Sequence, residues 1–223
     1  TPGFERVVKE LSAGYEVEYG FLGIRPADAT IEDFDGLTPA ERPSGGAVAL
    51  SVTANAPAAR GKVVAGDVVV EVDGVALRDS GDLMREIALI GPKNTTNIKV
   101  WRPSDQTFVS LKVSLGKWPV RNDDDVIATA YRLPDWRGIR VDYSTARSKY
   151  LRAGGVIEFE PGVLVVSVDE QRHGLKIQAG DFIGRVGDKR IRTPAEFNAA
   201  VIELGNRSAT LHTTDGRTIE IEP

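Results

Sequence analysis

The sequence predicts a mainly β fold with helices (α+β), made of two similar units that are each a partly open β-barrel or sandwich closed by one main helix. An internal repeat is the first observation behind this prediction. The segment Ala65–Val69, Ala-Gly-Asp-Val-Val, recurs at Ala179–Ile183 as Ala-Gly-Asp-Phe-Ile, an offset of 114 residues. Twice that offset is close to the full length of 223 residues, so two copies fill nearly the whole chain.

The second observation is the apolar pattern around each Gly-Asp pair. A segment of strand length precedes the pair and another follows it, and two alternating strands around a polar turn end each copy. The predicted strands beside the Gly-Asp pairs are 47–52, 68–72, 163–168 and 182–186. Each copy therefore has at least four strands, most of them antiparallel.

One main helix is predicted in each copy after these strands. In the first copy, Leu83, Ile87 and Ile90 recur at helical spacing, and Ser80 is the expected N-cap. In the second copy, the segment Thr193–Glu196 has the pattern of a capping box with proline at the first helical position. The polar stretch Asp28–Ser44, between Arg25 and Gly46 of the first copy, is expected to be a surface excursion.

Composition excludes several classes of function. Lys and Arg total 28 and Asp and Glu total 32, which gives a net charge of −4 and argues against a nucleic-acid partner. The chain has no cysteine, so disulfides, zinc-thiolate sites and a cysteine nucleophile are excluded. No apolar run approaches the length of a membrane span, and no signal peptide is visible. Because the first residue is Thr1 rather than Met, we expect a fragment or a processed product.

The polar groups that could carry out catalysis are sparse, and no catalytic residue is predicted. His173 and His212 are the only histidines, and no Gly-x-Ser-x-Gly motif accompanies them. Asp67 and Asp181 follow glycine at strand starts, where a carboxylate caps backbone N–H groups, so a structural role is expected for both. The acidic run Asn122–Asp125 does not have the spacing of a calcium loop, and a solvated linker without a metal is the preferred interpretation.

Four motifs occur in the order in which one protease family carries them. They are the segment Tyr19–Ile24 (Tyr-Gly-Phe-Leu-Gly-Ile), the small-residue turn Ala54–Ala59, the strand start Val64–Val69 and the helical segment Phe4–Leu11. Together they resemble the tandem PDZ domains that follow the protease domain in HtrA-type (DegP/DegQ-like) serine proteases. The resemblance covers nearly the whole chain and implies a regulatory module without a cofactor.

The resemblance also implies a division of the chain. Residues 1–18 would be the helix that leads in from a protease domain absent from this sequence. Residues 19–116 would form the first PDZ domain, 117–132 a linker, and 133–223 the second PDZ domain. We expect the two domains to fold separately.

In the first unit, the resemblance points to a loop that binds a C-terminal carboxylate. Successive N–H groups of Leu22, Gly23 and Ile24 would form the anion-binding concavity, and the glycine permits the required backbone turn. A bound peptide would add a strand to the sheet edge. Its last side chain would lie in a pocket whose predicted lining is Phe21, Ile24, Ser80, Met84 and Ile87. The alternative is that Phe21, Ile24 and Ile87 are plain core residues.

The second unit departs from this pattern. Its loop reads Trp136-Arg137-Gly138-Ile139, with Arg137 in the place of Leu22, and the further candidates from its helix are Asn198 and Val201. A charged side chain in an apolar pocket is costly unless it is paired, so Arg137 is expected to face solvent or a carboxylate. Arg137 and Arg140 could attract an acidic peptide, or they could be ordinary surface cations. Weaker binding of apolar C-termini is expected here.

The function implied by the resemblance is capture of C-termini or extended segments of unfolded proteins for a serine endopeptidase of the bacterial periplasm or cell envelope. Partners would be such peptides, the chain's own protease domain and, in an oligomer, further copies of the chain. An alternative is a scaffold for oligomerisation or docking that binds no free peptide. A third alternative is an enzyme with an unrecognised site.

Overall fold

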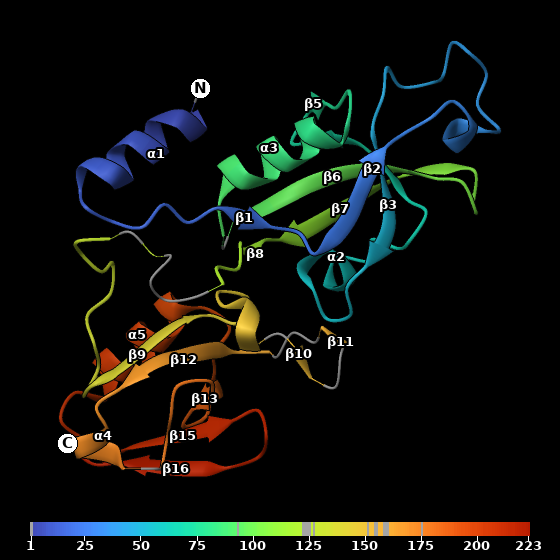
Figure 1. Ribbon diagram of the computed structural model, residues 1–223. Coiled ribbons are helices and arrows are strands. Elements are labelled where there is room, and N and C mark those ends of the chain that lie inside the picture. The colour runs from blue at the N-terminus through green and yellow to red at the C-terminus, as the bar shows by residue number, and fades with distance from the viewer. Residues whose placement is uncertain are drawn as a thin grey trace. The chain divides into compact units, whose positions relative to one another are not determined.

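The computed structural model describes residues 2–92, 94–121, 126, 128–150, 152–153, 156–157, 161–174 and 176–223. It is mainly β with helices, as predicted, and divides into two compact units (Figure 1). Unit 1 comprises Thr1–Glu5 and Glu18–Trp118, and unit 2 comprises Arg6–Val17 and Pro119–Pro223. Each unit contains one open six-stranded sheet. The run Asn122–Asp125, interpreted as a linker, lies outside the described residues.

Unit 1 is organised around an antiparallel sheet with strand order β2-β3-β4-β6-β7, to which β5 adds beside β4. The short strands β1 and β8 form a separate ladder. Its elements are β1 (Gly20–Phe21), β2 (Ile24–Asp28), η1 (Glu32–Phe34), β3 (Ala47–Val52), α2 (Pro57–Arg60), β4 (Val68–Val72), β5 (Val75–Ala76), α3 (Ser80–Ile90), β6 (Thr95–Arg102), β7 (Thr107–Ser114) and β8 (Gly116–Lys117).

The core of unit 1 lies between this sheet and α3. Leu83 and Ile87 from the predicted helical stripe are buried against Val69, Ile98 and Val100 of the sheet. The predicted strands 47–52 and 68–72 are confirmed as β3 and β4. The predicted cap is wrong by one residue: Asp79 is the N-cap, its carboxylate accepts the N–H of Asp82 at 2.8 Å, and Ser80 is the first helical residue.

The stretch between β2 and β3 is more than a surface excursion. It carries Phe34, which is buried with Val48, Val68, Val70 and Trp101 in a second apolar cluster. Residues of β4 alternate between this cluster and the main core, because successive side chains of a strand point to opposite faces. The stretch therefore covers the face of the sheet that lies opposite α3.

Unit 2 repeats this plan with strand order β16-β15-β13-β12-β9, and β14 beside β13. Its elements are β9 (Ile139–Tyr143), η3 (Ser148–Tyr150), β10 (Arg152–Ala153), β11 (Val156–Ile157), β12 (Val163–Val168), α4 (Glu170–His173), β13 (Phe182–Val186), β14 (Lys189–Arg190), α5 (Pro194–Leu204), β15 (Ala209–Thr213) and β16 (Thr218–Ile221). Helix α1 (Pro2–Ser12) contributes its residues from Arg6 onward to unit 2. The capping box predicted for α5 is present.

Asp67 and Asp181, the aspartates of the two Gly-Asp pairs, have the same structural role in their units, as predicted. Asp67 accepts the N–H of Val64 at 3.0 Å and pairs with Arg102 at 2.7 Å. Asp181 accepts the N–H of Gln178 at 2.9 Å and pairs with Arg217. Each carboxylate thereby ties the turn before the central strand to a residue of the closing hairpin.

Two further properties concern only the described residues. None of the helices seen there has the length and apolar character needed to cross a membrane. Within the same residues, no group of three or more histidine or carboxylate side chains is placed to hold a metal ion.

Candidate functional site

The candidate site in unit 1 lies along the outer edge of β2. This strand ends the sheet, with β3 as its neighbour on one side. Ala49 of β3 lies opposite Pro26, but both of its backbone groups bond to the turn before β4 instead. Its N–H donates to the C=O of Asp67, and its C=O accepts the N–H of Gly66. Pro26 is thus a non-hydrogen-bonded partner of β3, and its C=O points to the free edge.

The same alternation is seen at the two ends of β2, on either side of a register shift in which Arg25 pairs with Ser51 and Pro26 with Ala49. The N–H of Thr53 donates to Gly23 at 3.0 Å and the N–H of Ala29 donates to Gly46 at 3.0 Å, so residues 23 and 29 face β3. Since the backbone groups of a strand alternate in direction, Ile24, Pro26 and Asp28 face outward. An extended chain laid against β2 would meet these three residues.

The loop before β2 continues this row of outward groups. The C=O of Leu22 accepts the N–H of Ala58 at 2.8 Å, and the C=O of Gly23 accepts that of Thr53. In a trans peptide the C=O and the following N–H point in opposite directions. The N–H groups of Gly23 and Ile24 are therefore turned away from α2 and β3, next to each other, toward the free edge.

Glycine is required at position 23. Its φ is +82°, in the region that favours glycine, and a Cβ there would lie 2.3 Å from the Cβ of Ala56. The turn of the chain at Gly23 directs the N–H groups described above. Such a concave pair of N–H groups is suited to a carboxylate.

The seven residues predicted for this site do not all lie together. Leu22 and Ile87 are buried in the core, Ile24 packs against it, and Phe21 makes an edge-to-face contact with Trp118 at 5.6 Å. Met84 is 38% exposed on α3. Gly20 packs directly on the carbonyl of Ile87, so the loop lies at the C-terminal half of α3.

Ser80 lies two turns away, at the other end of α3. Its N–H and its hydroxyl both donate to Asp28, at 2.9 and 2.6 Å. These bonds lower the pKa of Asp28 below its usual value. Ser80 therefore links α3 to the end of β2 rather than joining Phe21 at the loop. Asp28 and Pro26 also lie on this edge, and the sequence analysis missed them because it predicted no strand at 24–28.

The loop of unit 2 makes the same hydrogen bond to its neighbouring segment as the loop of unit 1, but its own backbone is bonded differently. The C=O of Gly138 accepts the N–H of Asp169 at 2.8 Å, the counterpart of the Gly23–Thr53 bond. However, Trp136 and Ile139 exchange both backbone bonds, at 3.0 and 2.9 Å. Arg137 and Gly138 between them have φ of +52° and +77°, the signs of a tight two-residue hairpin turn. The N–H of Ile139 is thereby occupied within the loop.

Arg137 is half-buried, and its bonds are not foreseen from the sequence. Its guanidinium donates to four backbone carbonyls and lies 4.7 Å from the ring of Trp136. The four acceptors are Ile221 at 3.1 Å, Glu222 at 3.0 Å, Gly205 at 3.0 Å and Arg207 at 2.8 Å. The charge therefore fastens the loop to the end of α5 and to the C-terminal strand.

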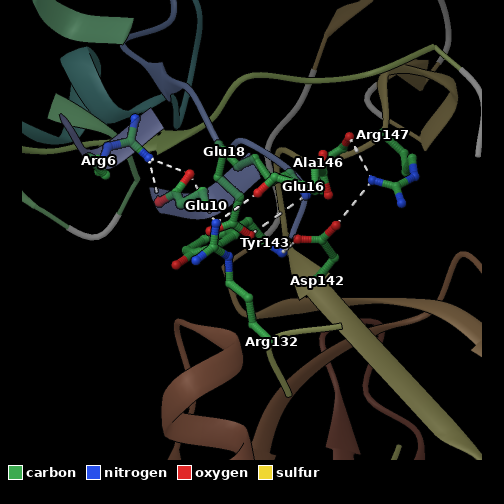
Figure 2. Close-up of polar contacts among 10 residues, drawn as sticks. Arg6, Glu10, Glu16, Glu18, Arg132, Asp142, Tyr143, Ala146 and Arg147 are labelled. Carbon is green, nitrogen blue, oxygen red and sulfur yellow. Dashed lines mark hydrogen bonds and ion pairs between the residues drawn. The ribbon is translucent and has the colours of Figure 1, made fainter. Parts of the chain in front are cut away.

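The edge of β9 is also occupied at its far end. Val165 bonds to Asp181 and Gly180 as Ala49 does to Asp67 and Gly66, so its partner Val141 faces outward. Tyr143, two residues on, donates its N–H to the carboxylate of Asp142 at 2.8 Å, and its C=O accepts the N–H of Ala146 at 2.9 Å. Arg147 holds the same carboxylate at 3.0 Å (Figure 2).

Comparison with known proteins accounts for these two related units. Residues 20–115 match the family model described as PDZ domain. A probable periplasmic serine endoprotease DegP-like from Halomonas elongata is 30% identical over 203 residues, which is 89% of this chain and 40% of that protein. A DegP-like protein of the same description from Brucella suis is 27% identical over 93% of this chain and 39% of its own length.

The chain thus contains a PDZ domain and resembles, over most of its length, one part of the DegP-like endoproteases. It spans about 40% of the length of the curated relatives. Among solved structures, the HtrA-type protease AlgWS227A with decapeptide is 27% identical, with a TM-score of 0.44 over 52% of this chain and 34% of that one. The residues that match the PDZ model include β1, β2 and α3 of unit 1.

The corresponding side of the second PDZ-like unit is a small hollow between β9 and α5. Leu133 and Pro134, which precede the loop, contribute to its lining together with Ile139, Arg140, Val141, Pro194, Phe197 and Asn198. Of the candidates in this unit, Trp136 packs edge-to-face on Phe197 at 5.9 Å and Val201 is buried in the core. Asn198 reaches the hollow.

The segment that precedes this hollow is held by a network within unit 2 (Figure 2). Glu10 accepts from Arg6 at 2.9 Å and from Arg132 at 3.0 Å, and Arg132 also donates to the backbone of Glu16 at 2.7 Å. Further along, Arg140 pairs with Asp135 at 2.7 Å and stacks on Tyr131 at 3.7 Å. Arg140 is therefore a structural cation whose guanidinium is engaged by its own chain.

Proposed function

We propose that unit 1 binds the C-terminal segment of an extended polypeptide by strand addition along β2. The terminal carboxylate accepts the N–H groups of Gly23 and Ile24, and the backbone of the last residues pairs with Ile24, Pro26 and Asp28. The observation that carries this proposal is the row of outward backbone groups that runs from the loop along β2, the last strand of the sheet in the described part of the chain.

The wider proposal follows from the relatives. As in the DegP-like proteins that are named periplasmic serine endoproteases, this chain would supply the peptide-binding, regulatory part of a serine endopeptidase in the periplasm or cell envelope. Its partners would be C-termini of unfolded proteins and the protease domain of the same protein. The unit would thereby deliver substrates or sense them.

A second role is proposed for unit 2. Its loop is closed by the Trp136–Ile139 pair, and Tyr143 at the far end of β9 is bonded to its own chain, so strand addition is disfavoured there. The scaffold alternative fits unit 2 better than unit 1: unit 2 would position or dock the module, in contact with the protease domain or other copies.

We also propose that the PDZ domains are 19–116 and 133–223, and that limited proteolysis of the chain cuts first between Lys117 and Arg132.

The peptide proposal is tested with the intact chain and fluorescent decapeptides that end in Val, Leu or Phe. Each peptide is made with a free C-terminal carboxylate and, as a matched control, with a C-terminal amide. Hydrogen bonds to a charged group contribute about 1.5–3 kcal/mol each, so amidation should weaken binding roughly ten- to a hundredfold. Equal affinities for the two forms would contradict carboxylate recognition, and absence of binding to every peptide would contradict the proposed function.

A further inference from the structure

A proline stands at the centre of the free edge of unit 1. Pro26 is the middle one of the three residues of β2 whose backbone faces outward. Proline has no N–H, and its ring carbons occupy the place where that hydrogen would be. Its C=O remains available. The edge therefore offers both backbone groups at Ile24 and at Asp28, but an acceptor alone at Pro26.

The register of a bound strand determines which ligand residue meets this gap. With the terminal carboxylate at the N–H groups of Gly23 and Ile24, the last ligand residue lies opposite Ile24, and in an antiparallel pairing the third residue from the end lies opposite Pro26. That ligand residue can donate its N–H to the C=O of Pro26. Its own C=O faces the proline ring and receives no hydrogen bond from β2.

We infer that Pro26 is a specificity- and affinity-determining residue of unit 1, which withholds one backbone hydrogen bond from a bound C-terminal strand. The inference rests on the proposed peptide-binding function and adds two requirements to it. The ligand must carry an N–H on its third residue from the end, which excludes proline there. The carbonyl of that same residue makes no contribution to affinity.

Proline at position 26 also protects the edge of the sheet from pairing with another strand. An edge strand with all its outward N–H and C=O groups free pairs readily with a second copy of itself, and proline is one of the residues that prevent this. The counterpart of Pro26 in unit 2 is Val141, which keeps its N–H, and there the neighbouring outward residues Ile139 and Tyr143 are bonded within the chain instead. The two units thus limit edge pairing by different means.

The test compares the intact wild-type chain with Pro26→Ala, and uses Pro103→Ala as the matched control. Pro103 is an exposed turn residue between β6 and β7, so its replacement removes a proline ring from unit 1 without touching the edge. Three versions of one fluorescent decapeptide with a free carboxylate serve as probes. One is unmodified, one has an ester in place of the amide that follows the third residue from the end, and one is N-methylated on that third residue.

Restoring the N–H should lower the Kd of the unmodified peptide for Pro26→Ala roughly three- to tenfold, the range expected of one backbone hydrogen bond. Pro103→Ala should bind like wild type. The ester, a poorer acceptor, should weaken binding to Pro26→Ala severalfold and leave wild type unchanged. N-methylation should weaken binding to both. Circular dichroism and size-exclusion chromatography establish that each variant is folded and monomeric at the concentrations used.

Unchanged or weaker binding by Pro26→Ala would overturn the inference, and so would a wild-type chain that distinguishes the ester from the amide. The second of these results needs no variant, so the inference stays testable even if Pro26→Ala associates with itself. Both results would leave the proposed function intact, because the unmodified peptide still binds. Failure of the wild-type chain to bind any carboxylate peptide would instead remove the proposed function and the inference with it.

Discussion

The edge strands β2 and β9 occupy the same place in two similar units, yet their outward backbone groups have different partners. Along β2 the loop N–H groups of Gly23 and Ile24 face the free edge, whereas along β9 the N–H of Ile139 bonds to Trp136. At the far end, Asp28 of β2 uses only its side chain to bind Ser80, whereas both backbone groups of Tyr143 are engaged. A shared fold therefore does not imply a shared binding function, because hydrogen-bond partners decide whether an edge can accept a strand.

The largest expected effect is loss of peptide binding when the loop of unit 1 is altered. Gly23→Val places a branched side chain at a φ of +82° and against Ala56, so the N–H groups lose their alignment. We expect affinity for the carboxylate peptides to fall by about a hundredfold or more, because two hydrogen bonds to a charged group contribute at least about 3 kcal/mol. Fluorescence anisotropy measures this, with circular dichroism to confirm folding.

The matched variant is Gly138→Val, at the corresponding glycine of unit 2. It too has a positive φ, +77°, and its Cβ would lie 2.7 Å from that of Asp169. We expect unchanged peptide affinity and a stoichiometry of one peptide per chain. Binding of two peptides per chain, or an equal loss of peptide affinity in the two variants, would contradict a functional difference between the units.

A second comparison concerns the ion pairs of the two Gly-Asp turns. Asp67 is fully buried and the side chain of its partner Arg102 is 17% exposed, whereas the side chain of Arg217, the partner of Asp181, is 39% exposed. Asp181 is also buried, at 9% exposed, so the two pairs differ mainly in how far water reaches the arginine. Removing the partner of a buried charge costs about 3–5 kcal/mol, and the loss is smaller where water reaches the pair. Denaturant unfolding should therefore show a larger loss of stability for Arg102→Ala than for Arg217→Ala, and the reverse order would contradict the burial argument.

A smaller effect is expected from Arg137. Its four bonds to carbonyls hold the second loop closed, so Arg137→Leu should destabilise unit 2 by about 1–3 kcal/mol. It should not create peptide binding, since the Trp136–Ile139 bonds remain. Denaturant unfolding of Arg137→Leu measures the loss of stability. Fluorescence anisotropy on the double variant Gly23→Val/Arg137→Leu, in which the loop of unit 1 is disabled, measures any peptide binding by unit 2. Strong binding by this double variant would mean that the charge alone had closed the second site.

The smallest effect concerns the link between β2 and α3. Hydrogen bonds from Ser80 lower the pKa of Asp28, so this link adds stability above the ordinary carboxyl pKa and loses it as the pH falls through the lowered pKa. Ser80→Ala should return the pKa of Asp28 to its ordinary value in an NMR titration and change peptide affinity less than about twofold. A large loss of affinity would instead place Ser80 in the pocket, as the sequence predicted.

Much of the fold could be predicted because it is encoded locally. The repeat, the apolar strands around Asp67 and Asp181 and the stripe at Leu83 and Ile87 depend on periodicity and turn chemistry, and all are present. The pattern predicts the cap at Ser80, whereas the structure has it at Asp79, because adjacent residues of similar capping strength cannot be separated by pattern alone.

The rest depends on contacts between distant parts of the chain. The acceptors of Arg137 follow it by 68 to 85 residues, and the direction of Pro26 is set by the pairing of β3 with its next neighbour. The burial of Trp101 under the stretch that carries Phe34 likewise needs tertiary structure. Sequence reasoning could locate the two loops, but it could not determine which of them is open.

The central claim is that a C-terminal peptide adds to β2 and not to β9, and amide NMR on the intact chain tests it most directly. On titration with the unmodified carboxylate decapeptide, the amides of Gly23, Ile24 and Asp28 should shift and become slower to exchange with solvent, while those of Ile139 and Val141 stay unchanged. Shifts and protection at Ile139 and Val141, or binding that leaves Gly23 and Ile24 unperturbed, would contradict the account.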